Sequence, residues 1–293
     1  MIELRIPATT ANLGPGFDSL GAAVSLYAHV SFTDSDKPLE IYGCSEKYCN
    51  SDNLIYTSYV HTFEIYGKTP KNATIGIRSE IPTSRGLGSS AACVVAGVAG
   101  ALHMMGMEQD IRLLLDISSQ IEGHPDNVAP AIYGGLTASM KTGDQVFTRQ
   151  FNMHEKINFY AFIPDFTLST AAARGILPKK IDFVDAVFNI SRIPLLLKGL
   201  EENDKELIRA SMQDRLHQPY RKSLIPGYES IEEACYENDC HTVYLSGAGP
   251  TIMCLSDQEG METRLSQVLD RLEHRWIIRK LTLDNNGIII LRS

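Results

Sequence analysis

Residues 81–93 read Ile-Pro-Thr-Ser-Arg-Gly-Leu-Gly-Ser-Ser-Ala-Ala-Cys and decide more about this chain than any other stretch. Gly86 and Gly88 carry no Cβ and adopt positive φ readily, so the backbone there can come close to another group. We expect Ser89 or Ser90 to cap the helix that follows. The first N–H groups of a helix lack partners and lie at its positive dipole end, which together make an anion site. A phosphate-binding loop is the first hypothesis.

The glycine pattern also has a structural interpretation. A glycine turn before a buried helix would look similar, because short glycine motifs occur often by chance. The small residues that follow, up to about residue 105, allow the helix to pack closely against neighbours in either case. The stretch is not a Walker A loop, since no Gly-Lys-Ser or Gly-Lys-Thr follows the glycines.

Composition excludes several classes of protein. The 293 residues can form two domains around one cleft, and 44% hydrophobic with 21% charged residues is typical of a globular chain. A net charge of −8 argues against a nucleic-acid partner held through phosphate contacts. We expect no membrane span, because no run of about 18 apolar residues occurs. We expect a cytoplasmic protein, because the first residues lack the features of a signal peptide.

The six cysteines, at positions 44, 49, 93, 235, 240 and 254, give no chemical signal. They show neither metal-ligand spacing nor a disulfide framework, and reduced thiols are expected in the cytosol. Cys93 lies in the helix after the glycine loop, where packing is the expected role. We assign no chemistry to any cysteine from the sequence.

Hydrophobic patterning predicts an irregular alternation of strands and helices. The predicted strands cover residues 2–6, 20–30, 39–42, 73–81, 157–163, 243–245, 251–255, 276–283 and 288–291. The predicted helices, besides the one after the glycine loop, cover residues 53–66, 107–121, 182–198, 204–212, 228–238 and 260–273. This order favours an α+β fold over a doubly wound sheet. A change of pattern around residues 140–155 is compatible with a domain boundary.

Two further blocks combine polar side chains or glycines with turning backbone. Residues 7–18 place Asn12 and Asp18 among glycines after a strand, where the carboxylate could hold an ammonium group or the segment could form an Asx turn. Residues 246–251 read Ser-Gly-Ala-Gly-Pro-Thr, and these glycines allow either a close approach to a ligand or a plain hairpin.

Residues 121–130 read Ile-Glu-Gly-His-Pro-Asp-Asn-Val-Ala-Pro and are dense in functional side chains. Glu122, His124 and Asp126 together suggest a transition-metal site, but their spacing matches no usual zinc pattern. A polar turn at the end of a helix is the alternative, and it would present His124, Asp126 and Asn127.

These blocks together resemble the GHMP kinases, the superfamily of galactokinase, homoserine kinase, mevalonate kinase and phosphomevalonate kinase. Residues 81–92 fit the phosphate-binding motif of the superfamily throughout, and residues 246–251 resemble its C-terminal glycine motif. Four blocks resemble those of homoserine kinases in particular, at residues 7–18, 121–130, 169–178 and 214–221. The resemblance therefore spans nearly the whole chain.

The resemblance implies an α+β, two-domain GHMP kinase fold. Its N-terminal, ATP-binding domain would be like domain 2 of ribosomal protein S5 and cover residues 1–150. Its C-terminal domain would be ferredoxin-like and cover residues 151–293. The implied activity is ATP-dependent phosphorylation of the side-chain hydroxyl of L-homoserine to O-phospho-L-homoserine, in threonine biosynthesis, and family habit implies a homodimer.

The resemblance also implies roles for individual residues. Glu122 and Ser90 would be catalytic by holding Mg²⁺. The residues that would bind the amino acid substrate are Asn12, Asp18, His124, Asn127, Arg174, Arg221 and Gly247, with Gly249 a weaker candidate. The residues that would bind ATP are Asn53, Pro82, Thr83, Ser84, Arg85, Gly86, Leu87, Gly88, Ser89, Ser90, Ala91 and Ala92. Asn53 fits a helix N-cap equally well, and no residue is assigned as general base.

Other interpretations stay open at the level of sequence. A GHMP kinase for another small alcohol, such as mevalonate or shikimate, would share the phosphate loop without needing Asp18 together with Arg174 and Arg221. A ligand sensor without catalytic activity would bind ATP without turnover, although intact Ser90 and Glu122 argue against it. A structural or interaction protein would show no nucleotide-dependent rise in melting temperature.

Overall fold

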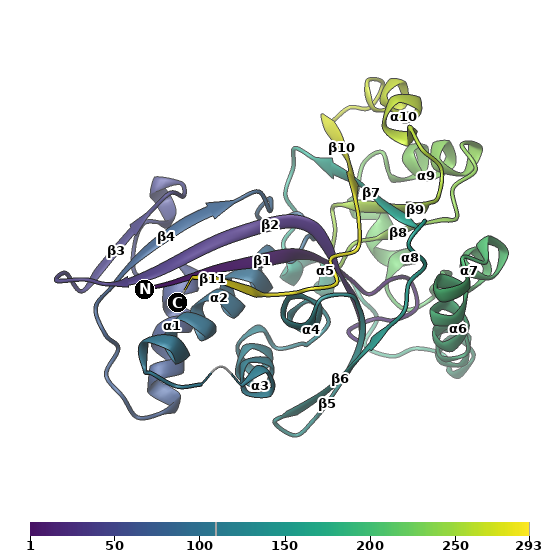
Figure 1. The fold of residues 1–293 in the computed structure, drawn as a ribbon. Coiled ribbons are helices and arrows are strands. Elements are labelled where there is room, and N and C mark those ends of the chain that lie inside the picture. Colours follow the sequence, from purple (N-terminus) through teal and green to yellow (C-terminus); the bar gives the residue numbers. More distant parts are fainter. Residues whose placement is uncertain (109, 293) are drawn as a thin grey trace.

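The protein, described by a computed structural model over residues 1–108 and 110–292, contains two β-sheets that lie side by side (Figure 1). The first sheet consists of β1 (Ile2–Ala11), β2 (Leu20–Asp34), β3 (Leu39–Tyr42), β4 (Ala73–Ser79), β5 (Leu136–Thr142), β6 (Gln145–Phe151) and β11 (Ile289–Arg292). Its order is β11-β1-β2-β4-β3, with β5 pairing β2 and β6 pairing β5. The second consists of β7 (Asn158–Pro164), β8 (Thr242–Leu245), β9 (Ile252–Ser256) and β10 (Trp276–Leu281).

The helices divide between the two sheets. Those that pack with the first sheet are α1 (Leu54–Ile65), α2 (Ser89–Met104), α3 (Ile111–Glu122) and α4 (Val128–Tyr133). Those that belong to the second half are α5 (Thr170–Gly175), α6 (Phe183–Glu202), α7 (Lys205–Ser211), α8 (Gln218–Arg221), α9 (Tyr228–Glu237) and α10 (Met261–Leu269). In the part of the chain that the structure describes, none of them is long and apolar enough to cross a membrane.

The second sheet has the ferredoxin-like arrangement. Its strands are antiparallel and lie in the order β10-β7-β9-β8, so the first strand in sequence is central and beside the last. Helices connect β7 to β8, and α10 connects β9 to β10, which gives the β-α-β-β-α-β pattern. The prediction of an α+β fold is therefore confirmed.

Alternate side chains of β7 enter two different cores. Phe159, Ala161 and Ile163 belong to the large core shared with the first sheet, whereas Tyr160 and Phe162 belong to a smaller core with α9 and α10. This alternation is the period of two expected of a strand buried on both faces. The two sheets are consequently fixed against one another by a continuous apolar core.

The division of the chain at residue 150 stays a prediction. β6 ends at Phe151 and β7 begins at Asn158, close to that position. The last strand, β11, instead returns to the first sheet and pairs with β1 in antiparallel register.

The prediction that the first strand ends near Pro7 was wrong. β1 continues to Ala11, because the residues after Pro7 pair with β2 from Ala8↔Val24 onward. A register shift between Pro7 and Ala8 accommodates the proline, which has no N–H to donate to a ladder.

Other predicted elements differ at their ends. The β5–β6 hairpin and α4 were not among the predicted elements. The helix predicted over residues 107–121 begins at Ile111, since the Asp110 side chain accepts a hydrogen bond from the Arg112 N–H; residue 109 lies outside the described residues. The helix predicted over 182–198 continues through Pro194 to Glu202.

Close packing of α1 on α2 predicts a cost for Gly97→Ala. A Cβ at Gly97 would lie 2.3 Å from the backbone oxygen of Ile55 and 2.7 Å from the Cβ of Ser58, so α1 would have to move. We expect the free energy of unfolding in urea to fall by about 1–3 kcal/mol.

Gly175→Ala is the matched control, because nothing lies within 4 Å of a Cβ at this helical glycine. It should be neutral or stabilise the fold by less than about 1 kcal/mol. Equal unfolding curves for Gly97→Ala and the parent protein would contradict the close packing of the two helices.

Candidate active site

A cavity of about 1190 Å³ brings together all the sequence blocks that carry functional side chains. The predicted site residues that line it are Asn12, Asp18, Asn53, Thr83, Ser84, Arg85, Gly86, Gly88, Ser89, Ser90, Glu122, His124, Asn127, Arg174, Arg221, Gly247 and Gly249. Pro82, Leu87, Ala91 and Ala92 are not among the lining residues, and the side chains of the last three are buried in the core. The side chains of Leu87, Ala91 and Ala92 therefore pack in the core beneath the loop and do not face the cavity.

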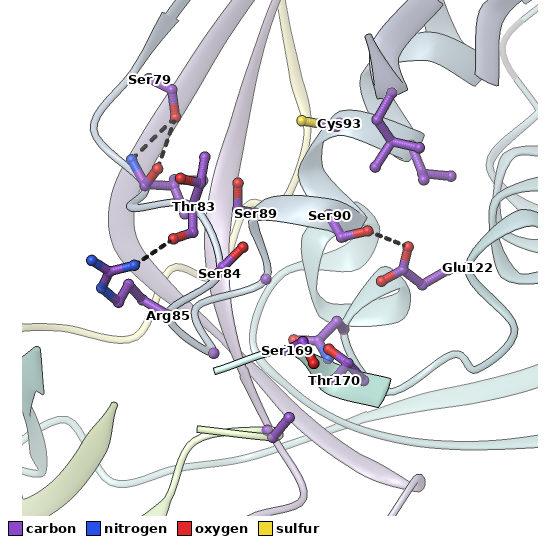
Figure 2. A pocket seen from close by; sticks show the side chains of 18 of the residues that line it. Ser79, Thr83, Ser84, Arg85, Ser89, Ser90, Cys93, Glu122, Ser169 and Thr170 are labelled. Carbon is purple, nitrogen blue, oxygen red and sulfur yellow. Dashed lines mark hydrogen bonds between the residues drawn. The ribbon is translucent and has the colours of Figure 1, made fainter. Parts of the chain in front are cut away.

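The glycine loop leads from β4 into α2, and Gly88 is the N-cap of that helix. Gly88 has φ of 68° and Gly86 has φ of 76°, so both use the left-handed region that glycine tolerates. The prediction that Ser89 or Ser90 caps the helix was wrong. They are its first two residues, and the Ser90 Oγ donates a hydrogen bond to Glu122 instead (Figure 2).

The glycine loop is clamped between the two halves of the protein. A Cβ at Gly88 would lie 1.9 Å from Thr9 Oγ1 of β1, and a Cβ at Gly86 would lie 2.4 Å from the Ser246 carbonyl oxygen. The Ser246 hydroxyl also donates to the Gly86 carbonyl at 2.6 Å, and the Thr251 N–H donates to the Arg85 carbonyl at 3.2 Å. The two glycine turns of the sequence therefore meet at one edge of the cavity.

Arg85 links the loop to the second sheet. Its Nε donates to the Pro164 carbonyl at 2.9 Å and its Nη2 to the Asp165 carbonyl at 2.7 Å, at the end of β7. Its Nη1 donates to the Thr83 carbonyl within the loop (Figure 2). The guanidinium is thus engaged with backbone carbonyls, while still lining the cavity.

Ser90 and Glu122 face one another at the start of α2 (Figure 2). The Ser90 Oγ lies 2.8 Å from Glu122 Oε2, and Glu122 is the last residue of α3. Burial raises the pKa of the Glu122 carboxyl above its ordinary value. A half-buried carboxylate and a hydroxyl, both on the cavity wall, are hard oxygen ligands of the kind that Mg²⁺ prefers.

Asp18 and Arg174 form a two-pronged ion pair across the cavity wall. Arg174 Nη2 lies 2.6 Å from Asp18 Oδ1, and Nη1 lies 3.0 Å from Oδ2. Asp18 is held in left-handed backbone, with φ of 55°, by its N–H bond to Asn12 Oδ1. The Asn12 amide in turn donates to the Gly247 carbonyl at 2.9 Å. The 7–18 block, α5 and the second glycine turn thus converge.

Arg221 is a buried cation that faces the same cavity. It is 1% exposed, and its Nε and Nη1 donate to the carbonyls of Ala173 and Gly247, each at 3.1 Å. Burial lowers its pKa to about 10, which still leaves it charged at neutral pH. Among the described residues no carboxylate forms an ion pair with it. A buried guanidinium without a carboxylate partner is suited to an anionic ligand.

Phe17 and His217 support both arginines, and sequence reasoning missed them. The guanidinium carbons of Arg174 and Arg221 lie 5.4 Å and 5.1 Å from the centre of the Phe17 ring, which stacks on His217 at 5.0 Å. The His217 Nε2 lies 2.9 Å from the Gly14 carbonyl, so Nε2 carries the proton and Nδ1 accepts from Arg221 Nη1 at 3.4 Å. Phe17 lies within the block at residues 7–18 and His217 within the block at residues 214–221, so membership of these blocks was the signal by which they could have been found.

His124, Asp126 and Asn127 form a hydrogen-bonded group in the cavity wall. His124 Nδ1 lies 2.8 Å from Asp126 Oδ1, and this bond raises the pKa of His124. The Asn127 amide donates to the same oxygen at 3.3 Å and accepts from the Thr9 hydroxyl at 2.8 Å. The structure therefore places the predicted turn residues in contact with β1.

The transition-metal interpretation of this block gains only weak geometric support. Ligand atoms of Asp18, His124 and Asp126 lie within 4.8 Å of one another. Both carboxylate oxygens of Asp18, however, accept from Arg174, and a neighbouring guanidinium repels a cation. Ser90 and Glu122 are the better fit to a metal ion.

Asn53 is the N-cap of α1, as one of its two interpretations predicted. Its Oδ1 accepts from the Ile55 N–H at 2.9 Å, and its Nδ2 donates to the Tyr48 carbonyl at 2.8 Å. It also lines the cavity, so a contact with adenine stays a prediction.

The raised pKa of Glu122 predicts a stability difference that depends on pH. The folded protein favours the protonated carboxyl, so this contribution to stability is present below the ordinary pKa of 4.5 and is lost as pH rises through the raised value. Glu122→Gln cannot ionise and should therefore become more stable relative to the parent protein as pH rises from 4.5 towards about 8.

Urea unfolding at several pH values in metal-free buffer measures this difference. Parallel stability curves for the two proteins would show that burial does not disfavour the Glu122 carboxylate.

Comparisons with known proteins agree with the fold. Residues 53–135 match the GHMP kinases N terminal domain and residues 196–274 match the GHMP kinases C terminal domain. A homoserine kinase of Clostridium botulinum (strain ATCC 19397 / Type A) is 43% identical over 292 residues, which cover 99% of this chain and 98% of the relative.

Solved structures extend the comparison. The crystal structure of homoserine kinase from Cytophaga hutchinsonii matches with a TM-score of 0.87 at 29% identity, over 99% of this chain and 97% of that one. A crystal structure of mevalonate kinase matches with a TM-score of 0.71 at 15% identity, over 98% of this chain and 100% of that one, and shares the fold. The two-domain architecture inferred from the motifs is confirmed, and the chain belongs to the GHMP kinase family, within the group of homoserine kinases.

Proposed function

We propose that this protein transfers the γ-phosphoryl group of ATP to the side-chain hydroxyl of L-homoserine, giving ADP and O-phospho-L-homoserine, a step towards threonine. One observation carries the proposal: a single cavity contains both the glycine loop at the start of α2 and the charges that suit a zwitterion, Asp18, Arg174 and Arg221. The name of the Clostridium botulinum relative supports the same substrate.

The charges match the α-ammonium and α-carboxylate of an amino acid. These two groups sit on one carbon atom, so a protein that binds both needs a carboxylate and a guanidinium side by side. Asp18 and Arg174 are side by side, with 2.6 Å between their nearest atoms. The substrate ammonium would replace Arg174 as the partner of Asp18. The substrate carboxylate would then bridge Arg174 and Arg221, which has no carboxylate partner among the described residues.

The glycine loop would hold the phosphates of ATP. The N–H groups of the first turn of α2 have no partners within the helix and lie at the positive end of the helix dipole. Gly86 and Gly88 have no side chains that would keep a phosphate away from the backbone. Asn53, which also lines the cavity, would lie at the adenine end of the nucleotide.

Ser90 and Glu122 would hold Mg²⁺, which supplies charge neutralisation to the phosphates when bound. Their hydrogen bond of 2.8 Å already orients the two oxygens toward one place. Glu122 comes from the end of α3 and Ser90 from the start of α2, and these helices are packed together. The ligand oxygens are therefore positioned by rigid elements.

Phosphoryl transfer depends mainly on alignment and charge neutralisation, so the proposal assigns no general base. The arginines and Asp18 fix the amino acid end, and the helix N-terminus fixes the phosphate end. The substrate hydroxyl would then face the γ-phosphate between these two fixed ends. His124 would contribute a donor toward the substrate, since its bond to Asp126 favours the protonated ring.

The alternative substrates fit these charges less well. Mevalonate has a carboxylate but no ammonium group, so it would leave Asp18 without a partner. A neutral alcohol would also leave Arg221 without an anion. A cytoplasmic location, expected from the first residues of the sequence, and a homodimer, implied by family habit, stay proposals.

Turnover of Mg-ATP, measured by coupled ADP release, tests the substrate. We expect strong activity with L-homoserine and little with L-serine, L-threonine, mevalonate or shikimate. ADP release with another alcohol would overturn the assigned substrate but keep the phosphate loop. No turnover with any of them, in protein that binds ATP, would favour a ligand sensor.

Asp18→Asn tests the ammonium site. Asn adopts left-handed backbone as readily as Asp, so the variant should fold with φ near the 55° of Asp18. Loss of the negative charge should raise the KM for homoserine roughly 10- to 100-fold, the range expected for a hydrogen bond to a charged group, and leave the KM for ATP unchanged.

Asp36→Asn is the matched control, because it removes the same charge from an exposed position outside the cavity. An unchanged KM for homoserine in Asp18→Asn would show that Asp18 does not hold the ammonium group.

A further inference from the structure

Two cysteines lie together beside the cavity. The Sγ atoms of Cys44 and Cys49 are 3.6 Å apart, with the short 3₁₀ turn η1 (Glu46–Tyr48) between them. Cys44 lines the cavity, and Cys49 is exposed to solvent. A disulfide requires sulfur atoms about 2.05 Å apart, so an approach of about 1.5 Å would join them.

The two ends of this loop differ in their surroundings. Gly43, next to Cys44, packs against β4 so closely that a Cβ there would lie 2.2 Å from the Ile77 carbonyl oxygen. Cys49 is exposed, and its N–H donates to the Glu46 carbonyl of the 3₁₀ turn at 3.0 Å, so it would move together with that turn. Closing the gap between the sulfur atoms would therefore draw Cys49 and the 3₁₀ turn toward Cys44.

The 3₁₀ turn is hydrogen-bonded to Asn53, a residue that lines the cavity. The Tyr48 carbonyl accepts the Asn53 Nδ2–H at 2.8 Å, and Asn53 caps α1 through its Oδ1. Lys47, Tyr48 and Asn53 all line the cavity. Movement of the turn would consequently displace Tyr48 from Asn53 and change the wall against which the nucleotide would lie.

We propose that Cys44 and Cys49 form a reversible disulfide under oxidising conditions, and that this disulfide weakens the binding of ATP. The proposal rests on the proposed function only in taking ATP as the ligand of the cavity.

The reaction balances with a peroxide as the oxidant. The exposed Cys49 sulfur attacks hydrogen peroxide, the O–O bond breaks, and Cys49 sulfenic acid and water form. The Cys44 sulfur then attacks the Cys49 sulfur, the S–O bond breaks, and the hydroxide leaves as water with the Cys44 proton. Two thiols and one peroxide thus give one disulfide and two waters, and a dithiol reductant reverses the change.

The surroundings distinguish the two sulfur atoms from each other and from the other cysteines. Burial, together with the hydrogen bond from Cys49, raises the pKa of the Cys44 thiol to about 11, so Cys44 keeps its proton until it reacts with the oxidised partner. Burial raises the pKa of Cys93 to about 12, and the cysteines at 235, 240 and 254 are buried. Oxidation should therefore be confined to the pair.

Mass spectrometry identifies the disulfide directly. Trypsin cuts after Lys47, between the two cysteines, so an unreduced digest of the oxidised protein should contain residues 6–47 linked to residues 48–68. Thiol titration of the unfolded protein should fall from six thiols to four, and dithiothreitol should restore all six.

Binding of Mg-ATP, measured by calorimetry on the full chain, tests the consequence. The dissociation constant should rise about tenfold on treatment with peroxide, as expected for the loss of one hydrogen bond of the pocket, and should recover with dithiothreitol. Cys49→Ser is the decisive variant, because it removes one partner of the disulfide at an exposed position outside the cavity wall. It should bind Mg-ATP equally before and after peroxide.

Three results would overturn the proposal. They are a digest without linked peptides, equal binding by the linked and reduced protein, and a loss of binding in Cys49→Ser as large as in the parent. Reduced protein that does not bind Mg-ATP would overturn the proposed function itself, and the inference with it. Because the linked peptides are detected without any ligand, these failures can be told apart.

Discussion

The close fit of the glycine loop between β1 and the 246–251 turn is the constraint on which the site depends. Gly88 leaves no room for a Cβ beside Thr9, and Gly86 leaves none beside the Ser246 carbonyl. Because β1 belongs to the first sheet and the turn joins β8 to β9 of the second, this contact fixes the two halves at the edge of the cavity. The loop is thereby rigid before any ligand arrives, which suits a site that works by alignment.

The cavity contains charges of both signs that the protein does not fully neutralise. Among the described residues Arg221 has no carboxylate partner and is buried against backbone carbonyls and the His217 ring, and the half-buried Glu122 carboxyl has a raised pKa beside the Ser90 hydroxyl. Charged groups without an ionic partner in a cavity wall concentrate at functional sites. An anion beside Arg221 and a cation beside Glu122 would neutralise both charges. The folded protein is therefore complementary in charge to its proposed ligands.

Sequence blocks predicted most of the elements and about half of the residues that line the cavity, because glycines, caps and short polar motifs act locally. They failed where distant contacts override local preference. Ser89 and Ser90 do not cap α2, since Gly88 takes that place in left-handed backbone. The strand through Pro7 continues because β2 pairs with it. The thiols of Cys44 and Cys49 approach one another only through the fold of the loop that carries them.

The sequence by itself determined the family, the α+β class, the glycine loop and the identity of the charged residues, because each depends on residue types at short, fixed spacings along the chain. Only the tertiary structure decided how those charges meet. Asp18 and Arg174 are 156 positions apart and form a two-pronged pair, and the Phe17 ring lies against both arginines. Such contacts depend on how two sheets pack around one core, and packing over that distance leaves no pattern of its own in a single sequence.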